Sequence, residues 1–150
     1  MDMTWVTDRI AVGGGIWHER NMMDVVAAGI THIIDMQIEF NDNQLGPEEY
    51  GIKVLWNPTD DDFLAKPPKL FQAGMDFVQA AFKERADAKV FIHCAAGVHR
   101  APMMALAVLC SIKQMSVDDA RELIEDKRPV ADFADVYVES VRAFLDGRGT

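Results

Sequence analysis

The sequence predicts an α/β fold with a mainly parallel central sheet and helices on both faces of the sheet. Four of the short apolar runs of strand type are separated by helical patterns or long crossovers, as the connection of parallel strands requires. Apolar side chains on consecutive residues of these runs indicate strands that are covered on both sides. Since 49% of the 150 residues are hydrophobic and no segment resembles a linker or a repeat, we expect one domain over residues 1–150.

The first half of the chain is predicted to hold one helix and most of the strands. The strand-like runs fall at residues 5–6, 10–12, 33–36 and 53–56. The helix is expected from His18 to Ala28, because Gly29 directly after it is typical of a helix end.

The second half is predicted to be mostly helical around one further strand at residues 89–92. One helix is expected after Pro67 and Pro68 and runs to about Arg85, and the others are expected at residues 101–112, 116–126 and 133–145. The run 101–112 is almost wholly apolar, which indicates a buried helix. Ser116 with Asp119 three residues later is similar to a capping box, which predicts where the third of these helices begins.

An octapeptide between the last strand and the buried helix carries the chemistry that the sequence predicts. It reads His93, Cys94, Ala95, Ala96, Gly97, Val98, His99 and Arg100. We expect it to form a loop at the carboxyl end of a strand, where open parallel sheets bind ligands. The backbone N–H groups at the helix N-terminus that follows would attract an anion.

The residue types in this loop suit a phosphate ester. Small side chains over residues 95–97 let the backbone curl around a phosphate, and Gly97 can adopt a positive φ. The planar guanidinium of Arg100 can meet two phosphate oxygens at once. The same positive field favours the thiolate of Cys94, which is the nucleophilic form of the side chain. We therefore expect residues 95–100 to bind phosphate and Cys94 to attack it.

A cysteine is more often a small buried hydrophobic residue than a nucleophile. The common role fits Cys110, which lies in the middle of the apolar helix pattern. For Cys94 the surrounding motif favours the nucleophile. As an exposed thiolate, Cys94 should also be open to reversible oxidation.

The octapeptide resembles the signature of the cysteine-dependent protein tyrosine phosphatases, which is His-Cys, five residues and Arg. The branch that the chain resembles most is the small dual-specificity phosphatases, which carry the signature well past the middle of one catalytic domain. The resemblance covers nearly the whole chain and is most specific at residues 93–100. It implies a protein tyrosine phosphatase-like fold and hydrolysis through a phosphocysteine. It also implies that His93 packs beneath the loop, hydrogen-bonds the backbone and shapes the loop.

The mechanism of this family needs a general acid, because an alkoxide or phenoxide leaves poorly unless it is protonated. Three aspartates, Asp60, Asp61 and Asp62, follow the strand-like run 53–56. The family often carries Pro-Thr, one residue and Asp at this place, so the resemblance selects Asp61. Asp60 and Asp62 stay open as alternatives, and so does an ordinary acidic surface turn without a catalytic role.

Two positions depart from the family pattern. Ala101 stands where Ser or Thr usually follows the arginine, so no hydroxyl can hydrogen-bond the Cys94 thiolate from there. A hydrogen bond to a charged group contributes about 1.5 to 3 kcal/mol, so breakdown of the phosphocysteine should be roughly ten- to a hundredfold slower. The same Arg-Ala-Pro continuation occurs in plant phosphoglucan phosphatases, which keeps a carbohydrate substrate open. Asp132 is the polar residue nearest to a family asparagine, and no role is assigned to it.

The net charge of the chain narrows the classes of ligand that the sequence favours. Fifteen basic and 24 acidic residues give a net charge of −9, which opposes binding to nucleic acid and to anionic membranes. The loop holds no lysine, so a phosphoinositide headgroup would find few counter-charges there. His18 and His32 lack partners at ligand spacing, and neither a metal nor another cofactor is expected. We expect Trp17, the acid loop and His99 to shape a shallow pocket.

The chain is therefore expected to be a phosphatase that acts on phosphotyrosine or on phosphoserine and phosphothreonine in proteins. A phosphatase for phosphorylated carbohydrate or lipid is one alternative, and a non-catalytic phosphate-binding module, favoured by Ala101 alone, is another. The N-terminus does not resemble a signal peptide and no apolar run reaches membrane-spanning length, so we expect a cytoplasmic protein with reduced cysteines.

Overall fold

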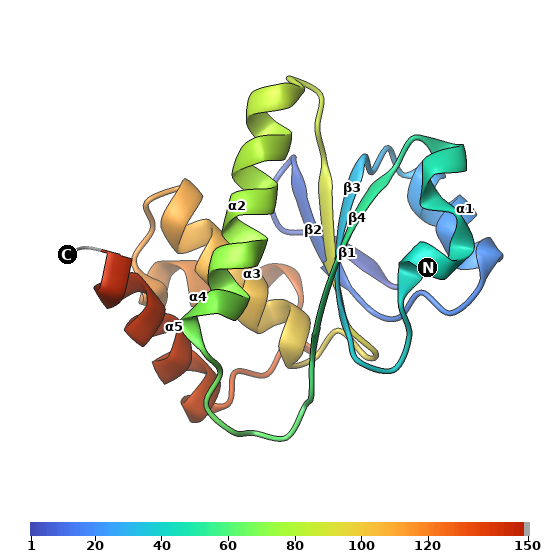
Figure 1. The fold of residues 1–150 in the computed structure, drawn as a ribbon. Helices are drawn as coiled ribbons and strands as arrows, with labels where there is room; N and C mark the ends of the chain where they lie inside the picture. Colours follow the sequence, from blue (N-terminus) through green and yellow to red (C-terminus); the bar gives the residue numbers. More distant parts are fainter. Residues whose placement is uncertain (149–150) are drawn as a thin grey trace.

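The computed structural model describes residues 1–148, and its sheet of five strands lies between two layers of helices (Figure 1). The strands are β1 (Met3–Trp5), β2 (Ile10–Gly13), β3 (His32–Gln37), β4 (Lys53–Thr59) and β5 (Val90–His93). Their order across the sheet is β1-β2-β5-β3-β4. β1 pairs antiparallel with β2, and the other neighbours are parallel. The structure thus confirms the predicted mainly parallel α/β fold.

The helices cover both faces of the sheet. They are α1 (Glu19–Ala27), α2 (Pro68–Glu84), α3 (Arg100–Ile112), α4 (Val117–Lys127) and α5 (Asp135–Arg148), with two short 3-10 helices at Asp42–Leu45 and Pro47–Tyr50. α1 and the 3-10 helices lie on one side of the sheet, and the other four helices lie on the opposite side (Figure 1). The central strands β3 and β5 are buried along their whole length, because helices cover them on both sides.

The predicted elements differ from the observed ones mainly at their ends. β1 ends at Trp5 rather than at residue 6, because the backbone N–H of Val6 already donates to Ile10 O across the turn. α5 begins at Asp135, so Phe133 lies before this helix rather than on it, although its side chain is buried as expected. Ser116 caps α4 as predicted, since its side chain accepts a hydrogen bond from Asp119 N at 3.0 Å.

Three loops meet at one edge of the sheet because the parallel strands β3, β4 and β5 all end there. The loop after β4, drawn in green, runs a long way past this edge before it enters α2 (Figure 1). Beside it lie the segment after β3 and the loop that joins β5 to α3. The fold thus brings segments that are far apart in the sequence around residues 93–100.

A cluster of three buried ionisable side chains lies beneath this edge. His93 Nε2 is 2.5 Å from Asp42 Oδ2 and 3.7 Å from Asp35 Oδ1, and all three side chains are inaccessible to solvent. Asp35 also accepts hydrogen bonds from the backbone N–H groups of Gln37 and Asp42, both at 2.9 Å. His93 Nε2 thus contacts a buried carboxyl, as a polar group in the interior must find a partner, and the role of His93 in shaping the loop stays a prediction. The cluster connects the end of β5 to the segment after β3.

The cluster predicts how stability depends on pH. Burial raises the pKa of Asp35 and of Asp42 from 3.8 to about 7, so folding favours their protonated forms. The resulting stabilisation is complete below about pH 4 and is lost as the pH rises through 7. Burial lowers the pKa of His93 to about 4, which acts in the opposite direction, since folding then weakens as the pH falls from about 6.5 towards 4.

We expect Asp42→Asn to flatten this dependence. Between about pH 5 and about pH 8, wild type should lose at least about 1 kcal/mol more unfolding free energy than the variant, measured by urea denaturation. Asp8→Asn is the matched control, because Asp8 is exposed and should leave the wild-type curve unchanged. Parallel curves for wild type and Asp42→Asn would contradict the assignment of the pH dependence to this cluster.

Candidate active site

The loop of residues 93–100 curls tightly between β5 and α3. Gly97 adopts a left-handed conformation with φ of 69°, as the sequence predicted for this position. Within residues 1–148, no hydrogen bond takes up the backbone N–H groups of residues 95–99. These five amides and the N-terminus of α3 are therefore available to an anion, which is the arrangement that the sequence predicted for phosphate.

Cys94 lies at the base of this loop. Cys94 is only 2% exposed because the loop folds over its side chain. The expectation of an exposed thiolate is therefore wrong. The backbone N–H of Ala101 donates to Cys94 Sγ at 3.4 Å. This amide contributes a hydrogen bond at the position where the family usually has a hydroxyl. Cys110 is buried in α3, and burial raises the pKa of its thiol to about 11, in keeping with the predicted core role.

Arg128 holds the loop from outside. Its Nε donates to Gly97 O at 2.8 Å, and one of its terminal nitrogens donates to Ala96 O at 3.4 Å. A bidentate ion pair with Asp2, at 2.9 and 2.7 Å, fixes the guanidinium at the end of α4. Because Arg128 holds the carbonyl groups of Ala96 and Gly97, the backbone N–H groups of the loop can point towards an anion. Sequence reasoning assigned no role to Arg128, although an arginine directly before a proline was a signal.

Arg100 is the second arginine at the loop, and it is 4% exposed. Its two terminal nitrogens donate to the two oxygens of Glu39, at 2.7 and 2.8 Å, and one of them also donates to Thr59 O at 2.9 Å. The hydrogen bond to Arg100 lowers the pKa of Glu39. The segment after β3 and the end of β4 therefore fix the guanidinium beside the loop. Glu39 lies in an exposed stretch without a sequence signal, which is why it was not predicted.

Of the three candidate acids, the fold brings Asp61 to the loop. Asp61 Oδ2 lies 2.9 Å from His99 Nδ1, and Asp61 Oδ1 accepts a hydrogen bond from the hydroxyl of Tyr137 at 2.9 Å. Asp62 instead forms an ion pair with Lys66 at 2.8 Å, which lowers its pKa. The side chain of Asp60 is exposed, and its backbone carbonyl accepts a hydrogen bond from Lys66 Nζ at 2.7 Å.

Aromatic side chains form part of the rim of the site. Phe63, which is 49% exposed, packs edge-on against His99 with ring centroids 5.0 Å apart. The ring centroids of Trp17 and Phe40 are 6.4 Å apart, so the structure places Trp17 beside the segment after β3 rather than against the acid loop. Asp132, which had no assigned role, lies 3.2 Å from His99 Nε2.

One buried cluster of side chains has the ligand types of a metal site. Asp35, Asp42 and His93 offer ligand atoms within 4.8 Å of one another, and among the described residues no other group could hold a metal ion. Two of these ligand atoms, His93 Nε2 and Asp42 Oδ2, already contact each other.

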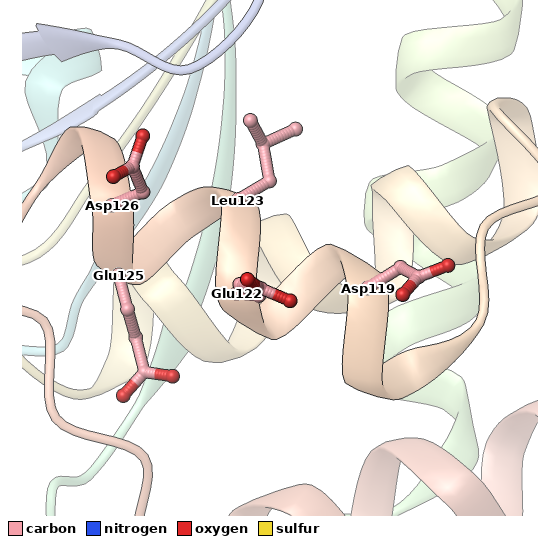
Figure 2. A pocket seen from close by; sticks show the side chains of 5 residues that line it. All are labelled: Asp119, Glu122, Leu123, Glu125 and Asp126. Carbon is pink, nitrogen blue, oxygen red and sulfur yellow. The ribbon is translucent and has the colours of Figure 1, made fainter.

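A surface hollow on α4 is lined by Leu123 and by four carboxylates, which would repel phosphate (Figure 2). The carboxylates belong to Asp119, Glu122, Glu125 and Asp126. Across residues 1–148, no helix is long and apolar enough to cross a membrane.

The loop geometry predicts a sharp difference between two glycine substitutions. A Cβ at Gly97 would lie 2.4 Å from the Arg128 side chain and 2.6 Å from the backbone of Gly13. A Cβ at Gly51, whose φ is 72°, would meet nothing within 4 Å. Both changes strain a left-handed backbone by about 1 to 2 kcal/mol, but only Gly97→Ala should also displace the loop.

Gly51→Ala should therefore bind inorganic phosphate like wild type in calorimetry, whereas Gly97→Ala should lose at least about tenfold in affinity because the amides no longer converge. Equal phosphate affinity of the two variants would show that the loop does not bind the anion.

Comparisons with known proteins agree with this geometry. The family model described as dual specificity phosphatase, catalytic domain, matches residues 18–145. Dual specificity protein phosphatase 1 of Homo sapiens is 28% identical over 119 residues, which cover 78% of this chain and 30% of that protein. Dual specificity protein phosphatase 5 of Rattus norvegicus is 36% identical over 75 residues, which cover 50% of this chain and 19% of that protein. The chain thus spans less than a third of the length of these relatives.

Solved structures show the same fold. Tk-PTP in its active form superimposes with a TM-score of 0.82 at 20% sequence identity, over 97% of both chains. PTPMT1 in complex with PI(5)P superimposes with a TM-score of 0.84 at 17% identity, over 99% of both chains. Because the family model covers most of the sequence and the fold agrees, this chain belongs to the dual specificity phosphatase catalytic domain family.

Proposed function

We propose that this chain hydrolyses phosphate monoesters through a phosphocysteine intermediate. The observation that carries the proposal is the convergence of Cys94, Arg100 and Asp61 on one loop whose amides are available to an anion. A module that only binds phosphate would need the amides and the arginine, but it would need neither the thiol beneath them nor the carboxyl beside them. Catalysis therefore explains more of the geometry than binding alone.

In the proposed reaction, the Cys94 thiolate attacks phosphorus while the bond to the leaving oxygen breaks. Asp61 gives its proton to that oxygen, and the alcohol or phenol departs. Asp61, now a carboxylate, then takes a proton from a water molecule that attacks the phosphocysteine, which releases phosphate and restores the thiolate. The loop amides and Arg100 stabilise the charge on the phosphoryl oxygens in both steps.

Several features support a phosphorylated protein as the substrate. The exposed apolar side chains of Phe63 and Leu64 offer contacts for a phosphotyrosine ring or a peptide next to the phosphate. The loop has no lysine, and Glu39 and Asp132 add negative charge near it, which disfavours polyphosphorylated headgroups and nucleic acid. A lipid substrate stays the second candidate, because the structural neighbour PTPMT1 was solved with PI(5)P.

The remaining parts of the proposal concern the chain as a whole. We take residues 1–150 as one catalytic domain that needs no metal, because every step above is assigned to a side chain or a backbone amide of this chain. The chemistry requires Cys94 to stay reduced, which fits a reducing compartment such as the cytoplasm.

Substitution of the reacting groups tests the mechanism. With p-nitrophenyl phosphate and EDTA, Cys94→Ser should abolish turnover, because serine lacks the thiolate nucleophile. On phenyl phosphate, which has a poor leaving group, Asp61→Asn should lower kcat by about a hundred- to ten-thousandfold. Asp60→Asn and Asp62→Asn are matched controls on the same loop and should stay within about threefold of wild type. Turnover that survives Cys94→Ser would disprove the phosphocysteine.

A substrate panel tests the assignment to proteins. We expect kcat/KM to be highest for phosphotyrosine or phosphoserine peptides, compared with phosphoinositide vesicles and phosphoglucan, because the site offers apolar contacts and few additional cations. Higher kcat/KM on vesicles would favour the lipid reading. Peptide binding without turnover on any member of the panel would favour the non-catalytic module.

A further inference from the structure

The imidazole of His99 stands between two carboxyl groups that come from different parts of the chain. Its Nδ1 lies 2.9 Å from Asp61 in the loop after β4, and its Nε2 lies 3.2 Å from Asp132 in the segment before α5. Because His99 itself belongs to the phosphate-binding loop, one side chain ties three segments together. None of the proposed chemical steps uses the side chain of His99 or that of Asp132.

The two contacts together define the form of the ring. An ionised carboxylate only accepts hydrogen bonds, so two carboxylates can both be satisfied only when both ring nitrogens carry hydrogen. Once Asp61 has given its proton to the leaving oxygen, each ring nitrogen of His99 can donate a hydrogen bond to one of the two carboxylates. Asp132 thereby fixes the orientation of the ring, so that the Nδ1–H group points at Asp61.

The other oxygen of Asp61 is held as well. The hydroxyl of Tyr137 donates to Asp61 Oδ1 at 2.9 Å and accepts a hydrogen bond from the backbone N–H of Phe63 at 3.1 Å. Burial raises the pKa of Tyr137 to about 12, so this hydroxyl keeps its hydrogen at neutral pH. The ring of Phe63 packs against both Tyr137 and His99, at 5.7 and 5.0 Å between centroids.

These contacts matter because the acid loop is otherwise exposed. Asp62, Phe63 and Leu64 all have exposed side chains, and only a few hydrogen bonds connect the loop to the body of the protein. Proton transfer requires the acid within hydrogen-bond reach of the leaving oxygen, and a displacement of about 1 Å can cost about a hundredfold in rate. A hydrogen-bond donor that holds Asp61 in place therefore has a larger effect on the rate here than it would have in a rigid loop.

We propose that His99 is the positioning residue of the general acid, and that Asp132 orients His99 for this role. The inference rests on the proposed function, since His99 acts through Asp61. When Asp61 gives its proton to the leaving oxygen, the carboxylate that forms is stabilised by His99 Nδ1–H and by the Tyr137 hydroxyl. His99 keeps its own hydrogens through both steps, and water supplies the proton that restores Asp61.

Two substitutions of the same residue separate this role from a purely structural one. In His99→Asn, the side-chain amide nitrogen can occupy the place of Nδ1 and still donate to Asp61. In His99→Gln, the longer amide reaches the place of Nε2 and loses the contact to Asp61. A structural role for His99 in the loop would make the two variants behave alike.

The readout is the dependence of kcat on the leaving group. Phenyl phosphate releases a phenol with a pKa of about 10, like tyrosine, and needs the acid, whereas p-nitrophenyl phosphate needs it much less. We expect His99→Gln to lose about ten- to a hundredfold in kcat on phenyl phosphate and little on p-nitrophenyl phosphate. His99→Asn should retain most of the activity on both substrates. Asp132→Ala should resemble His99→Gln with a smaller loss, and since Asp132 is exposed, its removal should not impair folding.

Inhibition by inorganic phosphate and the thermal midpoint provide the controls. Both should match wild type in all three variants, because the loop amides and Arg100 are unchanged. An equal loss on the two aryl phosphates, or equal behaviour of His99→Asn and His99→Gln, would overturn the role of His99 while leaving the phosphatase proposal intact. Wild-type turnover that does not depend on Cys94 would instead overturn the proposed function, and this inference with it.

Discussion

The structure depends on keeping a small region of positive potential inside a protein with a net charge of −9. The region consists of backbone N–H groups of the loop that follows β5, together with the guanidinium of Arg100. Its position relies on a second arginine, Arg128, whose hydrogen bonds to Gly97 O and Ala96 O hold the loop carbonyls on the outside. The amides can converge on an anion only while the carbonyls are held in this way. Cys94 and Asp61, the proposed nucleophile and the proposed general acid, both take their places relative to this loop.

Buried polar pairs set the frame around the loop. The contact between His93 and Asp42 joins β5 to the segment that presents Glu39 to Arg100. Such pairs are costly to break, because a group left without a partner cannot turn to water. Arg100, Arg128 and His93 each have a carboxyl partner from a distant part of the chain. The acidic residues that oppose anions at long range thus hold the anion-binding groups in place at short range.

Part of this site could be predicted from local sequence. Cys94 and Arg100 stand at a fixed spacing on one loop, and the strand before them and the apolar helix after them set the conformation of that loop. Asp61 was selected from three neighbouring aspartates through a family pattern, and the fold indeed brings only Asp61 to His99. Its neighbour Asp62 turns to Lys66, four residues further on. Contacts between distant segments, such as those of Glu39, Arg128 and Tyr137, leave no periodic pattern in the sequence and were missed.

The sequence by itself determined the class of fold and the loop between β5 and α3, on which it predicts a nucleophile and an anion site. These follow from short-range constraints: strand and helix periodicity, the small residues of the loop, and the glycine that accepts a positive φ at residue 97. Only the tertiary structure decided that Cys94 lies buried beneath the loop, that Glu39 holds Arg100, and that Asp61 meets both His99 and Tyr137. Those contacts arise because parallel strands end at the same edge of the sheet, which brings together segments separated by dozens of residues.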